Sequence, residues 1–147
     1  MLSKITIILL FLSLLVSCQQ SPQFVRKKPP IFYLTEHSKD SEYGKNEHKA
    51  IKTGGWKETG GHGGQRWFFS MLSGPNGEDI TAEREGACCW HKNPTGYKGM
   101  VILDKYHVYI GDSAKAITLY LNSYEYQSPK IPVGFGTKIK YNISIQR

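Results

Sequence analysis

The chain has 147 residues, of which 39% are hydrophobic and 21% charged, and its formal net charge at pH 7 is +7. This length suits one domain with a modest hydrophobic core. Basic chains often bind nucleic acid. Here the lysines are dispersed and the first residues predict export, so we expect no nucleic-acid partner.

Residues 1–17 predict a lipoprotein signal peptide. Lys4 precedes an apolar run at residues 5–16, which suits a secretory h-region and is shorter than the roughly 20 residues of a transmembrane helix. The run ends in Leu-Val-Ser-Cys, which resembles a bacterial lipobox at every position. By this resemblance, Cys18 would be acylated, become the N-terminus and hold the chain on the lipid bilayer. The alternative is an ordinary signal peptide with an incidental cysteine.

Residues 18–30 are predicted to be an acylated N-terminus followed by a flexible tether, because they are polar, contain proline and lack periodicity. In lipoproteins of Gram-negative bacteria, an Asp after the acylated cysteine marks inner-membrane retention. Gln19 stands there instead, which implies an outer-membrane lipoprotein facing the periplasm. The basic residues at 26–28 would either attract anionic headgroups or keep the tether soluble.

Residues 31–147 predict one α+β domain of mainly antiparallel β-structure. Residues 136–145 alternate strictly between apolar and polar, which is typical of a half-buried strand. Residues 100–110 and 116–124 are rich in β-branched and aromatic side chains, and a short turn joins them. We expect these three strands to form one antiparallel sheet. Further strands are expected at residues 31–35, as an edge, and 79–86.

One short helix is predicted at residues 65–74, and the alternative is a strand with both of its faces buried. Trp67, Phe68, Met71 and Leu72 would lie on one helical face. Gly74 stands near the expected C-cap position.

Residues 53–64 are rich in glycine but contain no phosphate-binding motif. His62, in this segment, could bind zinc or copper together with His91 and the cysteines, since both metals accept imidazole and thiolate ligands. The five histidines of the chain show no ligand spacing, so we expect no metal and no other cofactor.

The acidic residues give no catalytic pattern. Asp79, Glu83 and Glu85 are predicted to be charges on a strand surface. Asp104 and Asp112 are predicted to be solvated or to form turns. No catalytic residue is therefore assigned.

Cys88 and Cys89 are adjacent, and Trp90 and His91 follow them. If Cys18 is acylated, the two cysteines can pair only with each other or with another molecule. In an oxidising compartment this favours a vicinal disulfide, although Cα atoms about 3.8 Å apart lie closer than a relaxed disulfide prefers. Such a ring, with Trp90 and His91, could form a contact surface. Two reduced, buried thiols are the alternative.

Several motifs in this chain resemble a family of small lipoproteins from Bacteroidetes-type bacteria. They cover about two-thirds of the chain in matching order, at residues 43–55, 74–89, 99–110, 117–126 and 132–135. Many members carry the name 2-dehydro-3-deoxyphosphooctonate aldolase, although the family has no established activity. Enzymes of that name are (β/α)8 barrels of about 200 residues or more, so we expect no such activity here. The family usually has proline and an aromatic residue after the cysteine pair, whereas this chain has Trp90 and His91 there. Because the family pattern does without this histidine, a catalytic or metal-binding role for His91 is weakened.

Two classes of function follow. The first is a membrane-anchored, non-catalytic lipoprotein that binds a partner in the cell envelope. The second is a small periplasmic redox protein or other enzyme that uses Cys88 and Cys89. Redox proteins of the thioredoxin type use Cys-X-X-Cys, and this chain lacks that spacing around its cysteine pair.

Overall fold

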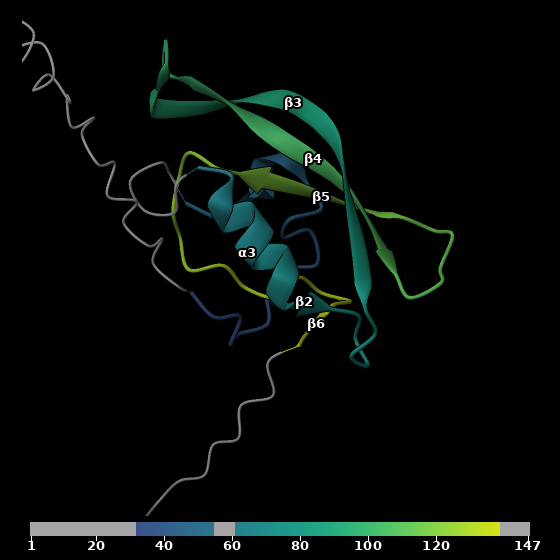
Figure 1. Cartoon of the computed structure of the whole chain (residues 1–147). Helices are drawn as coiled ribbons and strands as arrows, with labels where there is room; N and C mark the ends of the chain where they lie inside the picture. Colours follow the sequence, from purple (N-terminus) through teal and green to yellow (C-terminus); the bar gives the residue numbers. More distant parts are fainter. Residues whose placement is uncertain (1–31, 55–60, 139–147) are drawn as a thin grey trace, which may run out of the picture.

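The computed structural model describes residues 32–54 and 61–138 as a small domain built on a curved sheet with one short helix (Figure 1). The predicted fold class, mainly antiparallel β-structure with one helix, is confirmed for these residues. The predicted signal peptide and tether lie outside the described residues. In chain order the elements are η1 (Glu47–Lys49), β1 (Ile51–Lys52), α3 (Gly63–Met71), β2 (Leu72–Ser73), β3 (Ile80–Tyr97), β4 (Met100–Ile110), β5 (Ile117–Asn122) and β6 (Gly136–Thr137).

The main sheet has the strand order β1-β5-β4-β3. β3 pairs antiparallel with β4, and β4 pairs antiparallel with β5, whereas the short β1 lies parallel to β5. The strand predicted at residues 100–110 is confirmed as β4 with the same bounds. The strand predicted at 116–124 is confirmed in its central part as β5.

β3 is much longer than the strand predicted at residues 79–86, because it continues through the two cysteines to Tyr97. Lys98 and Gly99 then reverse the chain with φ values of 51° and 74°, and Tyr97 pairs with Met100. A two-residue turn with both φ values positive matches the right-handed twist of the strands that it joins. β3 and β4 thus form one long antiparallel ribbon that arches over α3 (Figure 1).

α3 packs on the concave face of the sheet through Gln65, Phe68 and Met71, which are buried. The predicted helix is confirmed, but its predicted face is partly wrong: Trp67 lies at the margin and donates a 2.7 Å hydrogen bond from Nε1 to the carbonyl oxygen of Phe32. The core around this helix consists of Phe32, Leu34, Ile51, Phe68, Met71, Leu72, Val108, Leu119, Leu121, Ile131 and Phe135.

The prediction that Gly74 stands near the C-cap of the helix is wrong, because the C-cap residue is Leu72. α3 ends at Met71, because Leu72 is already extended and pairs with Thr137 in the two-stranded β2–β6 sheet. We had expected the predicted strand 136–145 to join the main sheet. This expectation is wrong for its first residues, which pair with β2 instead. The remainder of that predicted strand lies outside the described residues.

The edge strand predicted at residues 31–35 is wrong for the described residues 32–35. Residues 32–35 form no strand with any other described residue, and the first pairing along the chain is the bridge between His37 and Ile131, two residues further on. Phe32 and Leu34 both point into the core, as alternate residues of a strand do, but no strand among residues 32–54 and 61–138 pairs with them. The alternation of apolar residues at 32–35 therefore indicated which side chains are buried, but it did not indicate a paired strand. None of the helices in the described part of the chain is both long and apolar enough to span a membrane.

Candidate functional site

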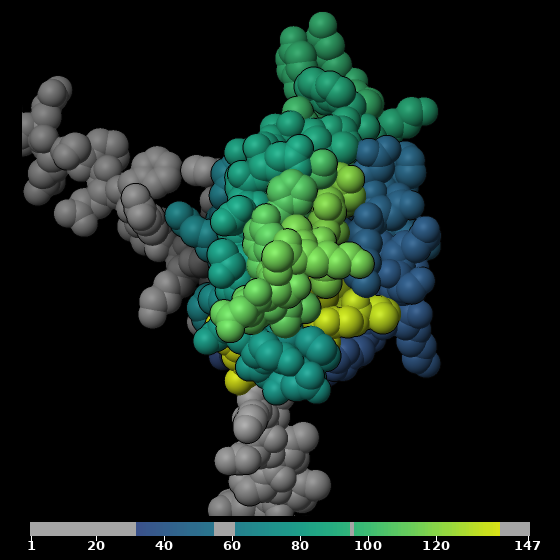
Figure 2. Space-filling view, turned by 90° about the vertical axis from the view of Figure 1, so that its right-hand side faces the viewer, coloured from purple at the N-terminus to yellow at the C-terminus, as the bar shows by residue number. Residues whose placement is uncertain are grey.

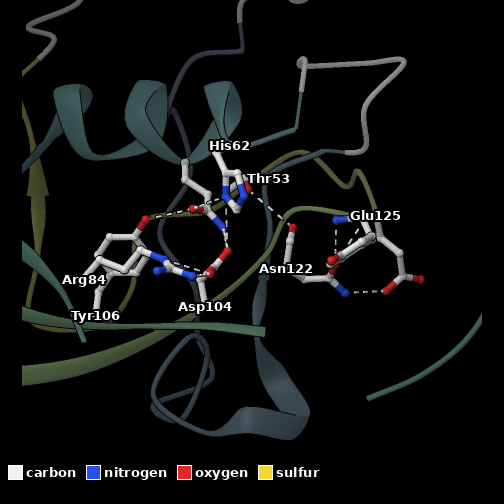
Figure 3. Close-up of polar contacts among 9 residues, drawn as sticks. Thr53, His62, Arg84, Asp104, Tyr106, Asn122 and Glu125 are labelled. Carbon is white, nitrogen blue, oxygen red and sulfur yellow. Dashed lines mark hydrogen bonds and ion pairs between the residues drawn. The ribbon is translucent and has the colours of Figure 1, made fainter. Parts of the chain in front are cut away.

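A buried polar cluster joins α3 to the main sheet at the centre of the domain (Figure 3). Asp104 of β4 is only 3% exposed. Its Oδ2 atom accepts a 2.6 Å hydrogen bond from Nε2 of Gln65, and its Oδ1 atom accepts two from the Arg84 guanidinium, at 2.9 Å from Nε and 2.5 Å from Nη2. The prediction that Asp104 is solvated or in a turn is therefore wrong.

Tyr106 and His62 complete this cluster. The hydroxyl of Tyr106 donates a 2.8 Å hydrogen bond to Oε1 of Gln65. The Nδ1 atom of His62 lies 3.3 Å from Oδ2 of Asp104 and 3.3 Å from Oε1 of Gln65. We define Gln65, Arg84, Asp104, Tyr106 and His62 as the central cluster.

The electrostatics of the central cluster follow from its burial and its one carboxylate. Burial raises the pKa of Tyr106, and the negative charge of Asp104 raises it further. The hydrogen bond to Asp104 raises the pKa of Arg84, so the guanidinium is always charged.

A histidine beside a buried aspartate is the arrangement that many general bases use. In this domain, however, both carboxylate oxygens of Asp104 already accept hydrogen bonds from Gln65 and Arg84. The His62 side chain is 67% exposed at the start of α3. The cluster is thus arranged to hold the helix on the sheet, with His62 at its solvent edge.

The second candidate site is the distal half of the β3–β4 ribbon. Beyond the end of β5 the two strands continue alone and project from the body of the domain (Figures 1 and 2). We call residues 86–103 the arm. It contains both cysteines, Trp90 and His91, which the sequence analysis singled out.

The sulfur atoms of Cys88 and Cys89 are joined in the structure as a disulfide between adjacent residues. Cys88 pairs with Leu103 and Trp90 with Ile102, so Cys89 is the extra residue of a β-bulge, with φ at 51°. Such bulges turn a strand and re-aim the side chains that follow. The oxidation state of the pair in the cell remains a prediction.

The two faces of the arm differ in exposure. Side chains of directly paired residues point to the same side of a sheet, and the register places five of them on one face: Trp90, Lys92, Tyr97, Met100 and Ile102. We call this set the arm face. Trp90 is 67% exposed and Tyr97 is 78% exposed.

The opposite face of the arm is directed inward. Val101, which pairs with His91, and Leu103, which pairs with Cys88, are both buried. Trp90 and His91, predicted together as a contact surface, therefore lie on opposite faces of β3. Trp90 is largely exposed and His91 is half-buried.

The arm is also unusual in charge. Residues 86–103 contain no Asp or Glu, whereas Lys92 and Lys98 are both exposed. The bordering acids have partners outside the arm: Glu85 lies 2.8 Å from both Lys105 Nζ and His107 Nε2, and Asp104 bonds to Arg84. Within residues 32–54 and 61–138, no three His, Cys, Asp or Glu side chains come together as a metal site would require.

No family model, curated protein or solved structure matches this chain. The function is therefore argued from the two sites themselves.

The sequence analysis missed Gln65, Arg84 and Tyr106 in the central cluster and Tyr97 on the arm. No sequence pattern indicates Gln65, because its partner Asp104 is 39 residues away. A signal for Tyr97 was present, since the Lys-Gly pair after it precedes a strong β pattern, as in a two-residue hairpin.

Proposed function

We propose that this chain is a lipid-anchored, non-catalytic lipoprotein of the cell envelope that acts by binding, and that the arm face is its contact surface. The observation that carries the proposal is the exposure of Trp90 and Tyr97 on the same face of a projecting ribbon. Large aromatic side chains are enriched at binding surfaces, because they combine apolar area with a polar group. Anchoring through Cys18 is the other half of the proposal, and it is supported by the lipobox resemblance alone.

The central cluster favours binding over catalysis. The carboxylate of Asp104 accepts hydrogen bonds from Gln65 and Arg84, and the Gln65 amide also accepts one from Tyr106. These bonds hold α3 on the sheet. A general base needs to reach a substrate proton, and Asp104 is enclosed by its partners. The cluster therefore supports a structural role, whereas the arm carries the two most exposed large hydrophobic side chains of the described residues, Trp90 and Tyr97.

The second candidate is the redox protein that uses Cys88 and Cys89. The observation that favours it is the position of this disulfide on the arm, where both residues are partly exposed. A thiol-dependent reductase assay, run on the chain and on a Cys88→Ser/Cys89→Ser variant, separates the two classes. Turnover that depends on the pair would favour the redox function over binding.

The arm is tested by lysine acylation of intact envelopes and of the purified protein, with mass spectrometry of each lysine. Lys92 and Lys98 lie on the arm, and Lys115 lies in the exposed turn at the other end of β4. We expect Lys92 and Lys98 to react several-fold more slowly in envelopes than in the purified protein, while Lys115 reacts alike in both. Reactivity of Lys92 and Lys98 that is the same in envelopes as in the purified protein would contradict the proposal.

A further inference from the structure

We infer that the arm face binds the surface of an anionic lipid bilayer. This inference rests on the proposed function and names the partner class of the same surface. It concerns the folded domain, so it is separate from the anchor at Cys18.

The side chains of the arm face suit the bilayer interface. Trp and Tyr are enriched at the headgroup level of membranes, because their rings are apolar and their N–H or O–H groups stay hydrated. Trp90 and Tyr97 are the two most exposed large hydrophobic side chains of the described residues. Met100 and Ile102 lie beside them on the same face and are partly exposed. One face of the arm therefore offers aromatic and aliphatic side chains together.

The charge of the arm gives it a preference for anionic lipid. Basic side chains near an anionic leaflet are attracted to it, and acidic side chains are repelled. Lys92 belongs to the arm face, and the Nζ atom of Lys98 lies 5.4 Å from the centre of the Tyr97 ring. Because residues 86–103 include no acid, nothing on the arm opposes this attraction.

The shape of the arm also fits a surface partner. On the opposite face Val101 and Leu103 are buried, so the arm face is the more exposed side of the ribbon and the one that can lie on a bilayer. The ribbon projects beyond the body (Figure 2), which lets it reach a flat surface before the rest of the domain does. A tether of about a dozen residues after Cys18 spans at most about 40 Å, so an anchored domain stays within reach of the membrane. Arm binding would then set the orientation of the domain.

The experiment uses the mature chain from residue 18 with a Cys18→Ala substitution, so that no acyl chain contributes to binding. Flotation is measured with vesicles of phosphatidylcholine alone and with vesicles in which about a quarter of the lipid is phosphatidylglycerol. We expect binding to the anionic vesicles and at least about tenfold weaker binding to the neutral ones. Brominated lipid should quench the fluorescence of this chain more than that of its Trp90→Phe variant.

Two pairs of variants test whether the arm face carries the binding. We expect Trp90→Ser/Tyr97→Ser and, separately, Lys92→Glu/Lys98→Glu to weaken binding to anionic vesicles by about tenfold or more. The matched controls are Tyr124→Ser, an exposed tyrosine after β5, and Lys115→Glu, an exposed lysine outside the arm. Both controls should bind as the parent does. Circular dichroism and urea midpoints show whether each variant is folded.

The outcomes separate this inference from the proposed function. If Lys92 and Lys98 are protected in envelopes but the chain does not float with anionic vesicles, the arm binds a protein or a glycan, and the bilayer inference is overturned alone. If the vesicles bind equally well to the arm variants, the inference is also overturned. If the lysines are unprotected in envelopes, both the inference and the proposed function fail.

Discussion

The side-chain amide of Gln65 in α3 donates a hydrogen bond of 2.6 Å to the carboxylate of Asp104 in β4, and both residues are buried. Through Asp104, this bond connects the helix to Arg84 in β3. A buried carboxylate is stable only when it is paired and hydrogen-bonded, so each partner depends on the others. The central cluster should therefore contribute to stability more than surface ion pairs do.

Asp104→Asn should lower the free energy of unfolding by about 2–3 kcal/mol, because it removes the charge that holds Arg84 and replaces one acceptor with a donor. The value is below that of a fully buried pair, since the Arg84 side chain is 46% exposed and can turn to water. Urea unfolding followed by circular dichroism measures the change. Asp112→Asn, in the exposed turn after β4, is the control and should shift stability by less than about 0.5 kcal/mol. Equal effects of the two substitutions would show that the central cluster adds nothing.

The domain should lose stability in acid. Hydrogen bonds from Lys49, Lys138 and Lys105 hold the pKa values of Asp40, Asp79 and Glu85, respectively, below their ordinary values. These carboxyls therefore bind protons more readily in the unfolded chain. Their contribution is complete above the unfolded pKa of about 4, and it is lost as the pH falls through the lower folded values.

This pH dependence is measured as the urea midpoint at pH values between about 6 and 2. We expect a progressive fall below about pH 4. Lys105→Met removes the main partner of Glu85, so this variant should show a smaller fall than the parent. A midpoint that stays constant, or rises, as the solution is acidified contradicts the prediction.

Cys18→Ser should release the chain from membranes, because serine cannot receive the thioether-linked lipid. The measurement is fractionation of cells that express the parent or the variant, followed by immunoblotting. The variant is expected in the soluble fraction or as an uncleaved precursor. If it fractionates with membranes as the mature parent does, the lipobox interpretation is wrong.

Cys88 and Cys89 should be oxidised to each other in protein isolated from its own compartment. With Cys18 acylated, the mature chain contains no other cysteine, and exported proteins meet an oxidising environment. Intact-mass measurement decides the matter, since a disulfide removes two hydrogen atoms. A full-mass species that takes up two alkylating groups without prior reduction would show that the thiols are free.

The strands and the helix were largely readable from the sequence, because their signals are local. The β-branched and aromatic run at residues 100–110 gave β4 its bounds. The apolar spacing around Phe68 and Met71 gave the helix. In both elements, apolar residues recur with the period of the strand or helix, so a short window of sequence is enough to predict the element.

The length of β3 was not readable, because bulges interrupt its periodicity. The register on β4 shifts after Arg84, after Cys88 and again after Lys92, so the strict alternation of side chains between the two faces is interrupted three times. The alternation therefore breaks at the cysteines although the strand continues. The pairing of Gly136 and Thr137 with β2 was hidden for another reason: their partners, Leu72 and Ser73, lie more than 60 residues earlier in the chain, and a strand pattern does not name its neighbour.

The sequence by itself thus determined the β-rich class and the adjacent cysteines, and it is the sole basis for predicting an export signal and a lipidation site at Cys18. Only the tertiary structure decided that Asp104 is buried against Gln65 and Arg84, and that Trp90 and Tyr97 share one exposed face. The first group depends on residues that are neighbours along the chain. The second depends on contacts between residues brought together by the register of β3 on β4 and the docking of α3, which no local pattern encodes.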